Sequence, residues 1–328
     1  MSKRKVARIY RGTPRNIAML ARRLRVGELV AVPTETVYGL AANAFDATAC
    51  ARIFRAKRRP RTDPLIVHIH SMTEFPLVCR PSAAAIRLAT RFWPGPLTLV
   101  LPKTPAVPLI VTAGRPSVAV RMPGHRVFRA LLARAGVPLA APSANPFGYV
   151  SPTTASHVLE GLGLKIGYIL DGGPSRVGLE STILDLRDAR RPRLLRPGAI
   201  TRRELEHTLR QKVAVWPPRR ASSTRAQLAP GLLRRHYSPR TPVILHRRLG
   251  RIGPANHAYV FVGRPSQRPA RNVFWLDPTG DLQGAARRLF ATLRKLDRMN
   301  FARIHVELAH GEGLAEAIND RLRRAAAK

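Results

Sequence analysis

Short apolar runs alternate with amphipathic stretches from residue 16 to residue 210. Short aliphatic runs bounded by polar or turn-forming residues are typical of buried strands, and they occur at 29–32, 65–69, 97–101, 118–120, 137–140, 166–170 and 182–186. Apolar residues at helical spacing predict helices over 47–57, 82–92, 126–135 and 153–160. This alternation predicts an α/β domain built on a mixed sheet.

Two of the predicted helix starts carry capping signals. Ser151 followed by Pro152 offers a hydroxyl N-cap and a proline at the first helical position, so we expect a helix to begin there. Thr201 and Glu204 have the spacing of a capping box, which predicts a helix to about residue 210.

The pattern breaks between residues 211 and 240, where prolines, serines and arginines replace the apolar periodicity. That composition predicts a linker between two domains. After it, strands are expected at 243–246, 258–262 and 304–307, and helices at 284–295 and 314–326. We therefore expect a large domain over 1–210, a linker over 211–240 and a smaller α/β domain over 241–328.

The segment PTETVYGL, residues 33–40, directly follows the apolar run 29–32. It places two hydroxyls and a carboxylate at the carboxyl end of a predicted strand. Ligands of open α/β sheets bind at that end of the strands, so the segment is a candidate ligand site.

The segment KRRPRTDPL, residues 57–65, joins a predicted helix to a predicted strand and holds several cations in a loop stiffened by two prolines. Two interpretations stay open. Cations in the last turn of a helix complement its dipole, whereas cations held close together in a stiff loop suit a polyphosphate.

Further polar clusters also lie at predicted strand ends, namely APSAN (141–145), GLEST (178–182) and LRPG (195–198). Short hydroxyl and amide side chains there either bind a ligand or simply form turns. In the linker, RHYSP (235–239) places a His and a Tyr where little core is available, which favours contact with a ligand. The chain has no GxxxxGK[ST], GxGxxG, HExxH or GxSxG segment, so a nucleotide site would be of another kind.

The formal net charge is +38, and almost all of the basic excess is arginine. One interpretation is an electrostatic surface for nucleotides or RNA. The other is that arginine occupies solvated faces without functional meaning, which the even spread of basic residues favours for most of them. In either case we expect non-specific binding to polyanions at low salt.

The remaining composition argues against a secreted or membrane protein. Cys50 and Cys79 are too few for a disulfide framework or a four-thiolate zinc site. We expect two buried, reduced thiols in a cytoplasmic protein. The N-terminus is basic without the apolar segment of a secretory signal, and the folded pattern begins by Asn16, too early for an organellar transit peptide. No run of about 18 apolar residues indicates a membrane span.

The order of PTETVYGL, KRRP, PLIVHI, WPGPLTLVL, VAVRMP, APSAN, ESTILD, RPGAIT and RRHYSP resembles the Sua5/YrdC family of threonylcarbamoyl-AMP synthases. The segment AINDRL at 317–322 is similar to the end of the long, Sua5-type members. The resemblance extends from about residue 16 to the C-terminus. It implies a YrdC-like twisted mixed sheet with helices and a concave basic cleft, plus a small Rossmann-like C-terminal α/β domain.

The resemblance also implies a nucleotidyltransferase. The family joins L-threonine, bicarbonate or CO2, and ATP into L-threonylcarbamoyladenylate and pyrophosphate, and we expect Mg2+ with the ATP. The product serves the N6-threonylcarbamoyladenosine modification at position 37 of tRNA. A downstream tRNA threonylcarbamoyl-transferase machinery is therefore the expected partner.

Matching motif positions imply the site residues. Lys57 and Arg59 are expected to hold the ATP phosphates and to be catalytic. The other expected nucleotide contacts are Asp63, Ser117, Ser143, Asn145, Ser151, Arg196 and His236. The expected threonine pocket comprises Thr34, Thr36, His68, Arg121, Ala141 and Ser181. Arg121 suits the bidentate recognition of a carboxylate, and His236 would close over the nucleotide, which makes the linker a lid.

Three positions depart from the family pattern: Arg58 replaces a common Gly, Asp63 a common Asn and Ser238 a usual Ala. Asp63 raises the main question, because a carboxylate beside ATP repels phosphate unless it holds Mg2+. In the expected mechanism, a threonine carbamate attacks the α-phosphorus while Lys57, Arg59 and Arg196, with Mg2+, stabilise the phosphate charge. Replacing Lys57 or Arg59 by Ala is expected to abolish product formation and leave the fold intact.

Two rival interpretations remain. A non-enzymatic RNA-binding module fits the charge, but aromatics are only 6% of the chain and no RNP1 segment is present. Weak RNA contact can still accompany catalysis, including contact with double-stranded RNA. A carbamoyl-transfer domain of hydrogenase-maturation proteins shares the expected fold, but the acylphosphatase segment and zinc-finger cysteines of those proteins are absent.

Overall fold

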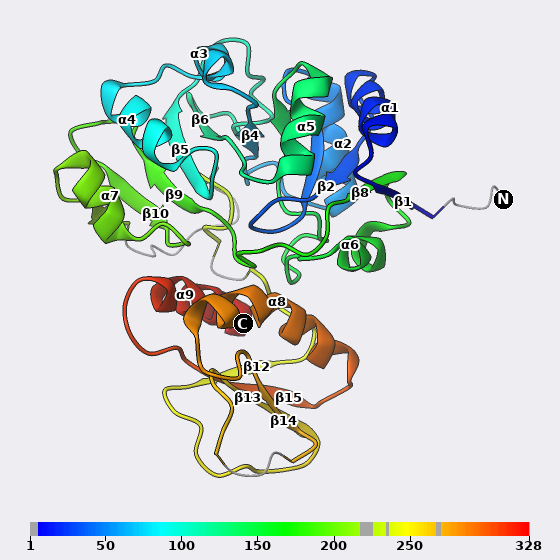
Figure 1. Cartoon of the computed structure of the whole chain (residues 1–328), viewed down its shortest axis with the longest axis vertical. Helices are drawn as coiled ribbons and strands as arrows, with labels where there is room; N and C mark the ends of the chain where they lie inside the picture. Colours follow the sequence, from blue (N-terminus) through cyan, green and yellow to red (C-terminus); the bar gives the residue numbers. More distant parts are fainter. Residues whose placement is uncertain (1–5, 217–225, 234–235, 267–269, 328) are drawn as a thin grey trace.

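The computed structural model describes residues 6–216, 226–233, 236–266 and 270–327. It contains a large body that holds the N-terminus and a smaller body that holds the C-terminus (Figure 1). The two bodies correspond to the two predicted α/β units, while the boundaries at residues 210 and 240 stay predictions.

The large body is built on a mixed sheet, to which the described residues contribute eleven strands in the order β1-β8-β2-β3-β7-β4-β6-β5-β9-β10-β11. Some neighbours pair antiparallel, as β2 and β3 do, and others parallel, as β4 and β6 do. The strands are β1 (Arg8–Arg11), β2 (Val30–Val32), β3 (Gly39–Asn43), β4 (Ile66–His68), β5 (Leu97–Pro102), β6 (Ser117–Arg121), β7 (Leu139–Ala140), β8 (Tyr168–Asp171), β9 (Thr182–Asp185), β10 (Arg193–Arg196) and β11 (Ala214–Val215).

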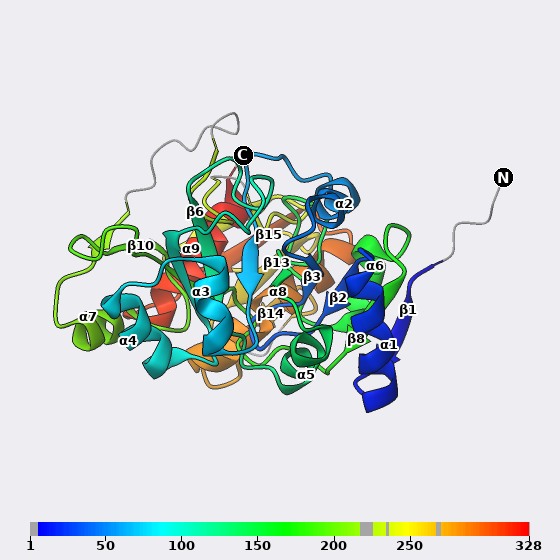
Figure 2. The same ribbon diagram turned by 90° about the horizontal axis from the view of Figure 1, so that it is seen from above.

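Helices cover both faces of this sheet (Figures 1 and 2). Val30 and Val32 of β2 pack in a cluster with α1 and α5, whereas Ala31 between them belongs to the cluster that contains α2. This is the two-residue period of a strand buried on both faces. The helices are α1 (Pro14–Arg25), α2 (Ala47–Lys57), the 3-10 turn η1 (Met72–Glu74), α3 (Phe75–Val78), α4 (Ala83–Phe92), α5 (Arg126–Ala135), α6 (Ala155–Leu162) and α7 (Arg202–Leu209).

The small body is a parallel sheet, with four strands among the described residues in the order β12-β15-β13-β14. Its helices α8 and α9 lie on the side of the sheet that faces the large body (Figure 1). Phe290 and Leu293 of α8 share one apolar cluster with Val37, Val150 and Leu179 of the large body. The small body is therefore packed against the large one through a common core. Its elements are β12 (Val243–His246), β13 (His257–Phe261), β14 (Val273–Trp275), α8 (Leu282–Arg298), β15 (Arg303–Glu307) and α9 (Leu314–Ala326).

Most of the predicted elements are confirmed, and α2, α5, β12 and α9 have the predicted bounds. Strand β1 was not predicted: the largely exposed segment Arg8–Arg11 forms an edge strand paired with β8, so the fold has already begun by Asn16. One expectation was wrong. Helix α6 begins at Ala155 rather than after Ser151, since the Thr154 hydroxyl accepts from the backbone N–H of His157 and caps the helix.

The capping box at Thr201 and Glu204 is confirmed by reciprocal side-chain to backbone hydrogen bonds. Arg58, which replaces a common Gly, ends α2 with φ of 53° in the left-handed region. That conformation favours glycine, which explains why glycine is common at this position. Part of the predicted linker, including Arg235 of the RHYSP segment, lies outside the described residues.

Candidate active site

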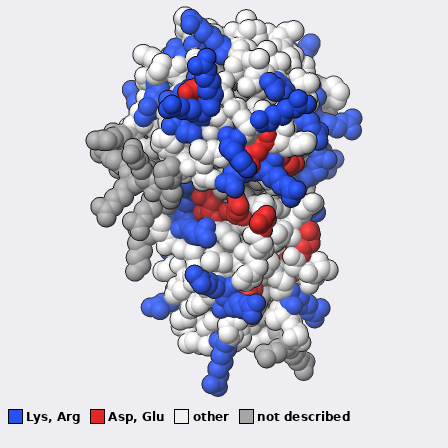
Figure 3. All heavy atoms as spheres, turned by 90° about the vertical axis from the view of Figure 1, so that its left-hand side faces the viewer, with Lys and Arg blue, Asp and Glu red and all other residues white. Residues whose placement is uncertain are grey.

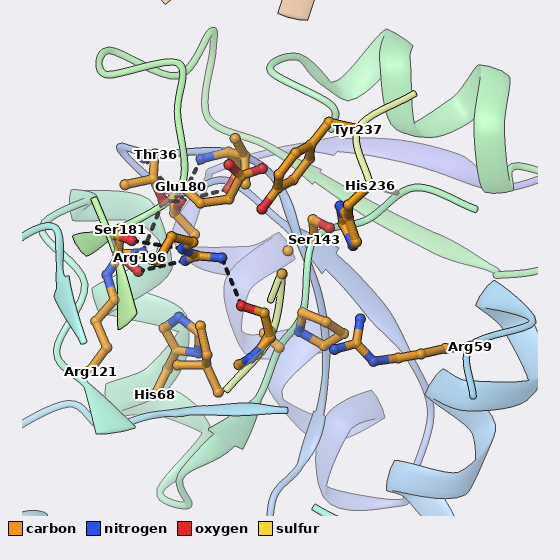
Figure 4. A pocket seen from close by; sticks show the side chains of 18 residues that line it. Thr36, Arg59, His68, Arg121, Ser143, Glu180, Ser181, Arg196, His236 and Tyr237 are labelled. Atoms are coloured by element: carbon orange, nitrogen blue, oxygen red, sulfur yellow. Dashed lines mark hydrogen bonds between the residues drawn. The ribbon is translucent and has the colours of Figure 1, made fainter. Parts of the chain in front are cut away.

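The predicted site residues converge on a cavity of about 40 Å3, between strand ends of the large sheet and the linker (Figure 4). It lies where β2, β4, β6, β9 and β10 end or begin, as expected for a ligand site of an α/β sheet. The predicted residues that line it are Thr34, Thr36, Arg59, His68, Arg121, Ala141, Ser143, Ser181, Arg196 and His236.

Most of the other predicted residues lie directly behind this lining. The Lys57 ammonium donates to the carbonyl oxygens of Ser143, at 2.6 Å, and Asn145. Ser151 donates at 2.6 Å to Glu180, a carboxylate that itself lines the cavity. Asp63 and Ser117 are the remaining predicted residues that do not line the cavity. Ser117 lies at the start of β6, away from the lining, and its buried hydroxyl has no partner among the described residues.

The PTET segment forms a hydroxyl-stabilised turn after β2. The Thr34 hydroxyl accepts from the backbone N–H groups of Thr36 and Val37, both at 3.1 Å, and donates to the Val37 carbonyl at 2.6 Å. Thr34 therefore shapes the loop. The hydroxyl of Thr36 lies 2.7 Å from that of Thr34 and accepts from Arg121.

Arg121, at the end of β6, is held in place by three acceptors. Its guanidinium donates to the Gly95 carbonyl at 3.0 Å, to Thr36 Oγ1 at 2.9 Å and to Glu35 Oε1 at 2.6 Å. A guanidinium has five N–H donors, so two remain for a ligand. Such a preorganised fork suits a carboxylate.

The KRRP loop supplies a second cationic group. Arg59 forms a buried ion pair of 2.9 Å with Asp63 and donates to the carbonyls of Asp63 and Pro64. Asp63 is thus neutralised by Arg59, which answers the concern that its carboxylate faces phosphate unpaired. Arg196 of β10 donates to the Ser181 carbonyl at 3.0 Å and to the Pro230 carbonyl at 3.3 Å.

Burial and neighbouring charges shift the pKa values of this site. Burial, followed by the charge of Arg59, holds the pKa of Lys57 well below its usual value. Burial, followed by Arg121, lowers the pKa of His68 to about 3, so the imidazole is neutral at pH 7. For Glu35 burial is the largest influence and raises the pKa, but Arg121 and the Gly124 N–H together outweigh it and the pKa is lowered.

The linker forms the roof of the cavity. Pro230, Gly231, His236 and Tyr237 line it opposite the strand ends (Figure 4). His236 packs edge-on against Tyr237, with ring centroids 4.2 Å apart, and against Phe147 at 5.8 Å. Burial, and then the charge of Arg59, holds the pKa of His236 well below its usual value.

Sequence reasoning gave no role to two residues that the structure makes central: Glu35 anchors Arg121, and Glu180 accepts from Ser151. Tyr237, which the RHYSP segment indicated as a ligand contact, lines the roof. Glu35 and Glu180 each stand inside a segment quoted above, directly beside a predicted residue. Their roles depend on partners far away in the sequence, so no local spacing indicated them.

Comparisons with known proteins show the family of the chain. Residues 22–198 match the Sua5/YciO/YrdC family model described as telomere recombination, and residues 200–327 match the C-terminal domain model of threonylcarbamoyl-AMP synthase. The chain belongs to the Sua5/YrdC family of threonylcarbamoyl-AMP synthases.

Individual relatives support the same assignment. The chain is 42% identical over 316 residues to the threonylcarbamoyl-AMP synthase of Pyrococcus abyssi, covering 92% of this chain and 91% of that one. It is 44% identical over 236 residues to the Bacillus subtilis enzyme, covering 70% and 66%. The crystal structure of P. abyssi Sua5 complexed with L-threonine superposes with a TM-score of 0.88, at 39% identity and 98% coverage of each chain.

The described part of the chain lacks two further kinds of feature. No group of three or more His, Cys, Asp or Glu side chains there could hold a metal ion. No described helix is long and apolar enough to cross a membrane.

Proposed function

We propose that this chain is an L-threonylcarbamoyladenylate synthase that uses the cavity between the strand ends and the linker as its active site. The observation that carries the proposal is the convergence of a preorganised arginine fork and a separate group of buried cations on one cavity. Membership of the family gives these two halves their substrates, L-threonine and ATP.

The threonine half is the pocket around Arg121. Its two remaining donors fit the carboxylate of the amino acid, and Thr36, His68, Ala141 and Ser181 are the other lining groups assigned to it. His68 is neutral at pH 7 and therefore adds no charge that would repel the threonine ammonium. L-threonine is the ligand of the P. abyssi structure that superposes on this chain.

The phosphate half is the group formed by Lys57, Arg59 and Arg196. Arg59 is neutralised by Asp63, but neither Lys57 nor Arg196 makes an ion pair in the described part of the chain. Both bind backbone carbonyls instead. Arg196 therefore carries a charge that no carboxylate of the described residues neutralises, and Lys57, with its lowered pKa, can take up a proton beside a bound polyphosphate.

ATP cannot enter the cavity as it stands. A space of about 40 Å3 is far below the roughly 300–1,000 Å3 of ordinary ligand pockets. Gly231, His236 and Tyr237 occupy the roof, so the linker must move to admit the nucleotide. This supports the predicted lid, with closure excluding water from a labile mixed anhydride.

The described residues do not fit a protein-bound Mg2+. The carboxylates near the cavity are already paired with arginines, and no described cluster has the ligands for a metal. We assign no step to the ion. In the assay it accompanies ATP as its counter-ion.

The reaction follows from positioning. The amine of threonine combines with CO2 to form a carbamate, with release of a proton, or with bicarbonate, with release of water. A carbamate oxygen attacks the α-phosphorus of ATP, and the bond to the β-phosphate oxygen breaks to release pyrophosphate. Arg121 orients the amino acid, while Lys57, Arg59 and Arg196 stabilise charge on the phosphates.

The test is product analysis by mass spectrometry with ATP, Mg2+, bicarbonate and L-threonine, beside serine and no-bicarbonate controls. We expect threonylcarbamoyladenylate and pyrophosphate only when threonine and bicarbonate are both present. Folded protein that binds ATP and forms no adduct would refute the proposal. Supply of the adenylate to a tRNA threonylcarbamoyl-transferase machinery, and a cytoplasmic location, are part of the same proposal.

RNA binding has less support as a second function. On the face that Figure 3 shows, basic side chains are spread over both bodies, with acidic side chains near their boundary and no single basic stripe. This distribution favours non-specific contact with polyanions over a dedicated RNA site.

A further inference from the structure

Helix α9 of the small body reaches the active site through a buried arginine. Arg321 is 1% exposed, and its Nε donates at 2.8 Å to Glu180 Oε2 of the large body. The other oxygen of this carboxylate accepts from Ser151 at 2.6 Å. Glu180 lines the cavity and precedes Ser181, so the small body holds a carboxylate of the cavity lining.

Arg321 also begins a row of side chains in contact with one another that crosses the roof. Its guanidinium lies 5.6 Å from the Tyr237 ring centroid, and Tyr237 packs edge-on against His236 at 4.2 Å. His236 contacts Phe147 at 5.8 Å, and Arg59 lies 6.0 Å from the Phe147 ring centroid. This row joins helix α9 to a predicted phosphate-binding arginine through the lid.

A second arginine of the same helix holds the backbone of the linker. Arg324 Nη1 donates at 2.7 Å to the Leu233 carbonyl. The Arg324 carbonyl in turn accepts from the Ser238 hydroxyl at 3.3 Å and from the His236 N–H at 3.4 Å. The linker is therefore fastened to α9 on both sides of residues 234–235.

Asp320 fixes the orientation of both arginines. Its carboxylate pairs with Arg321 at 2.7 Å and with Arg324 at 3.1 Å. The Asn319 amide exchanges two hydrogen bonds with the backbone of Ala309, which anchors the helix to the loop after β15. These contacts give a physical role to the AINDRL segment, which the proposed function alone leaves unexplained.

We propose that Arg321 and Arg324 are positioning residues of the nucleotide site. Arg321 neutralises and orients Glu180 and supports Tyr237, while Arg324 fastens the linker, so that His236 is placed over the cavity. The small body thus completes the active site. This inference rests on the proposed synthase function only for its kinetic readout.

The experiment compares wild type with Arg321→Met, Arg321→Lys and Arg324→Met in the full-length chain. Arg323→Met is the matched control, because Arg323 lies exposed on the same helix. Hydrogen–deuterium exchange of the peptide covering 229–240 reports on the lid without catalysis. Steady-state kinetics with pyrophosphate release gives separate KM values for ATP and bicarbonate.

We expect Arg321→Met and Arg324→Met to speed exchange over 229–240 at least fivefold and to raise the KM for ATP at least tenfold. The KM for bicarbonate and the properties of Arg323→Met should stay within twofold of wild type. Arg321→Lys should recover part of the ATP affinity, since it restores the charge beside Glu180. Wild-type exchange and wild-type ATP KM in folded Arg321→Met and Arg324→Met would overturn the inference.

The buried Arg321→Met change risks unfolding, because it leaves Glu180 uncompensated. The double variant Glu180→Gln/Arg321→Met removes both charges and keeps the test available. We expect this double variant to have a free energy of unfolding close to that of wild type and still to show fast hydrogen exchange over 229–240. Exchange as slow as in wild type would count against the proposal. If wild type itself makes no adduct, the synthase function fails, and the exchange data still decide whether α9 fastens the lid.

Discussion

Replacing Lys57 by Met tests the phosphate half of the site. The substitution keeps an unbranched side chain of similar length and removes the ammonium with its two hydrogen bonds to the carbonyls of Ser143 and Asn145. Methionine is preferable to alanine, because Lys57 is 1% exposed and alanine would also leave a cavity. The sequence alone led us to expect that Lys57→Ala leaves the fold intact. Because Lys57 is buried, Lys57→Met is the safer variant for this test.

Two effects on stability oppose one another. Each buried carbonyl that loses its donor costs about 1–3 kcal/mol. The lowered pKa of Lys57 shows that its charge is itself unfavourable in the folded state, so removing the charge offsets part of this loss. We expect the free energy of unfolding of Lys57→Met to fall by about 3 kcal/mol or less.

The effect on catalysis should be larger. Loss of one preorganised group that stabilises developing charge costs about a hundred- to thousandfold in kcat. Pyrophosphate release in the presence of ATP, threonine and bicarbonate measures this directly. Lys103→Met is the matched control, because Lys103 also donates to two carbonyls, those of Thr104 and Val107, and does not line the cavity.

Lys57 should also couple ATP binding to proton uptake. Burial, and then Arg59, holds its pKa well below the usual value, and a bound phosphate would raise it again. Calorimetric titration in buffers of different ionisation enthalpy measures the protons taken up, and Lys57→Met should abolish the part due to this residue. Folded Lys57→Met with kcat/KM within threefold of wild type and unchanged proton uptake would refute the assignment.

Three further results are expected. Arg121→Lys loses the bidentate fork, so the KM for threonine should rise about 10- to 100-fold while the KM for ATP stays near wild type; equal effects on both would contradict a threonine-specific role. The pKa of His68 is lowered to about 3, so the unfolded chain binds a proton below pH 6.5 that the folded protein excludes. Stability should therefore fall by as much as about 5 kcal/mol between pH 6.5 and 3, and denaturant titrations of His68→Gln should show a shallower loss. Gly231→Ala strains φ of +76° and brings Cβ within 2.5 Å of the Tyr237 hydroxyl, so ATP affinity and melting temperature should both drop. Gly136→Ala, at φ of +67° with open space around it, isolates the backbone strain, and equal losses in both variants would exclude a role for the contact.

Local signals explain which elements could be predicted. The side chain of Asp46 caps the start of helix α2, and α5 ends at Gly136 in the left-handed region. Neighbouring residues therefore determine these two helix ends. Strand β1 carries no such signal, since it has only two apolar residues between two arginines and gains its partner, β8, from far along the chain. Strand order depends in the same way on pairings that no local pattern encodes.

In the site, too, features set by local sequence could be predicted and features set by distant partners could not. The resemblance to the family supplied most of the predicted residues that line the cavity, whereas the motifs at strand ends indicated only which segments were candidate ligand sites. The partners of those residues could not be predicted. Glu35 and Arg121 are 86 positions apart, and Glu180 and Arg321 are 141 apart, so their pairing exists only in the folded chain.

The buried charges of the site explain how an arginine-rich protein can recognise ATP selectively. Carboxylates neutralise three of the arginines around the cavity, while Lys57 and Arg196 bind only uncharged groups among the described residues. Buried charge is screened by salt much less than the exposed arginines that cover the surface. Under the proposed assignment, ATP binding depends on a few buried cations rather than on the net charge of +38, so salt should weaken non-specific contact with RNA well before it weakens ATP binding. The neutralised pairs are Glu35–Arg121, Asp63–Arg59 and Glu180–Arg321.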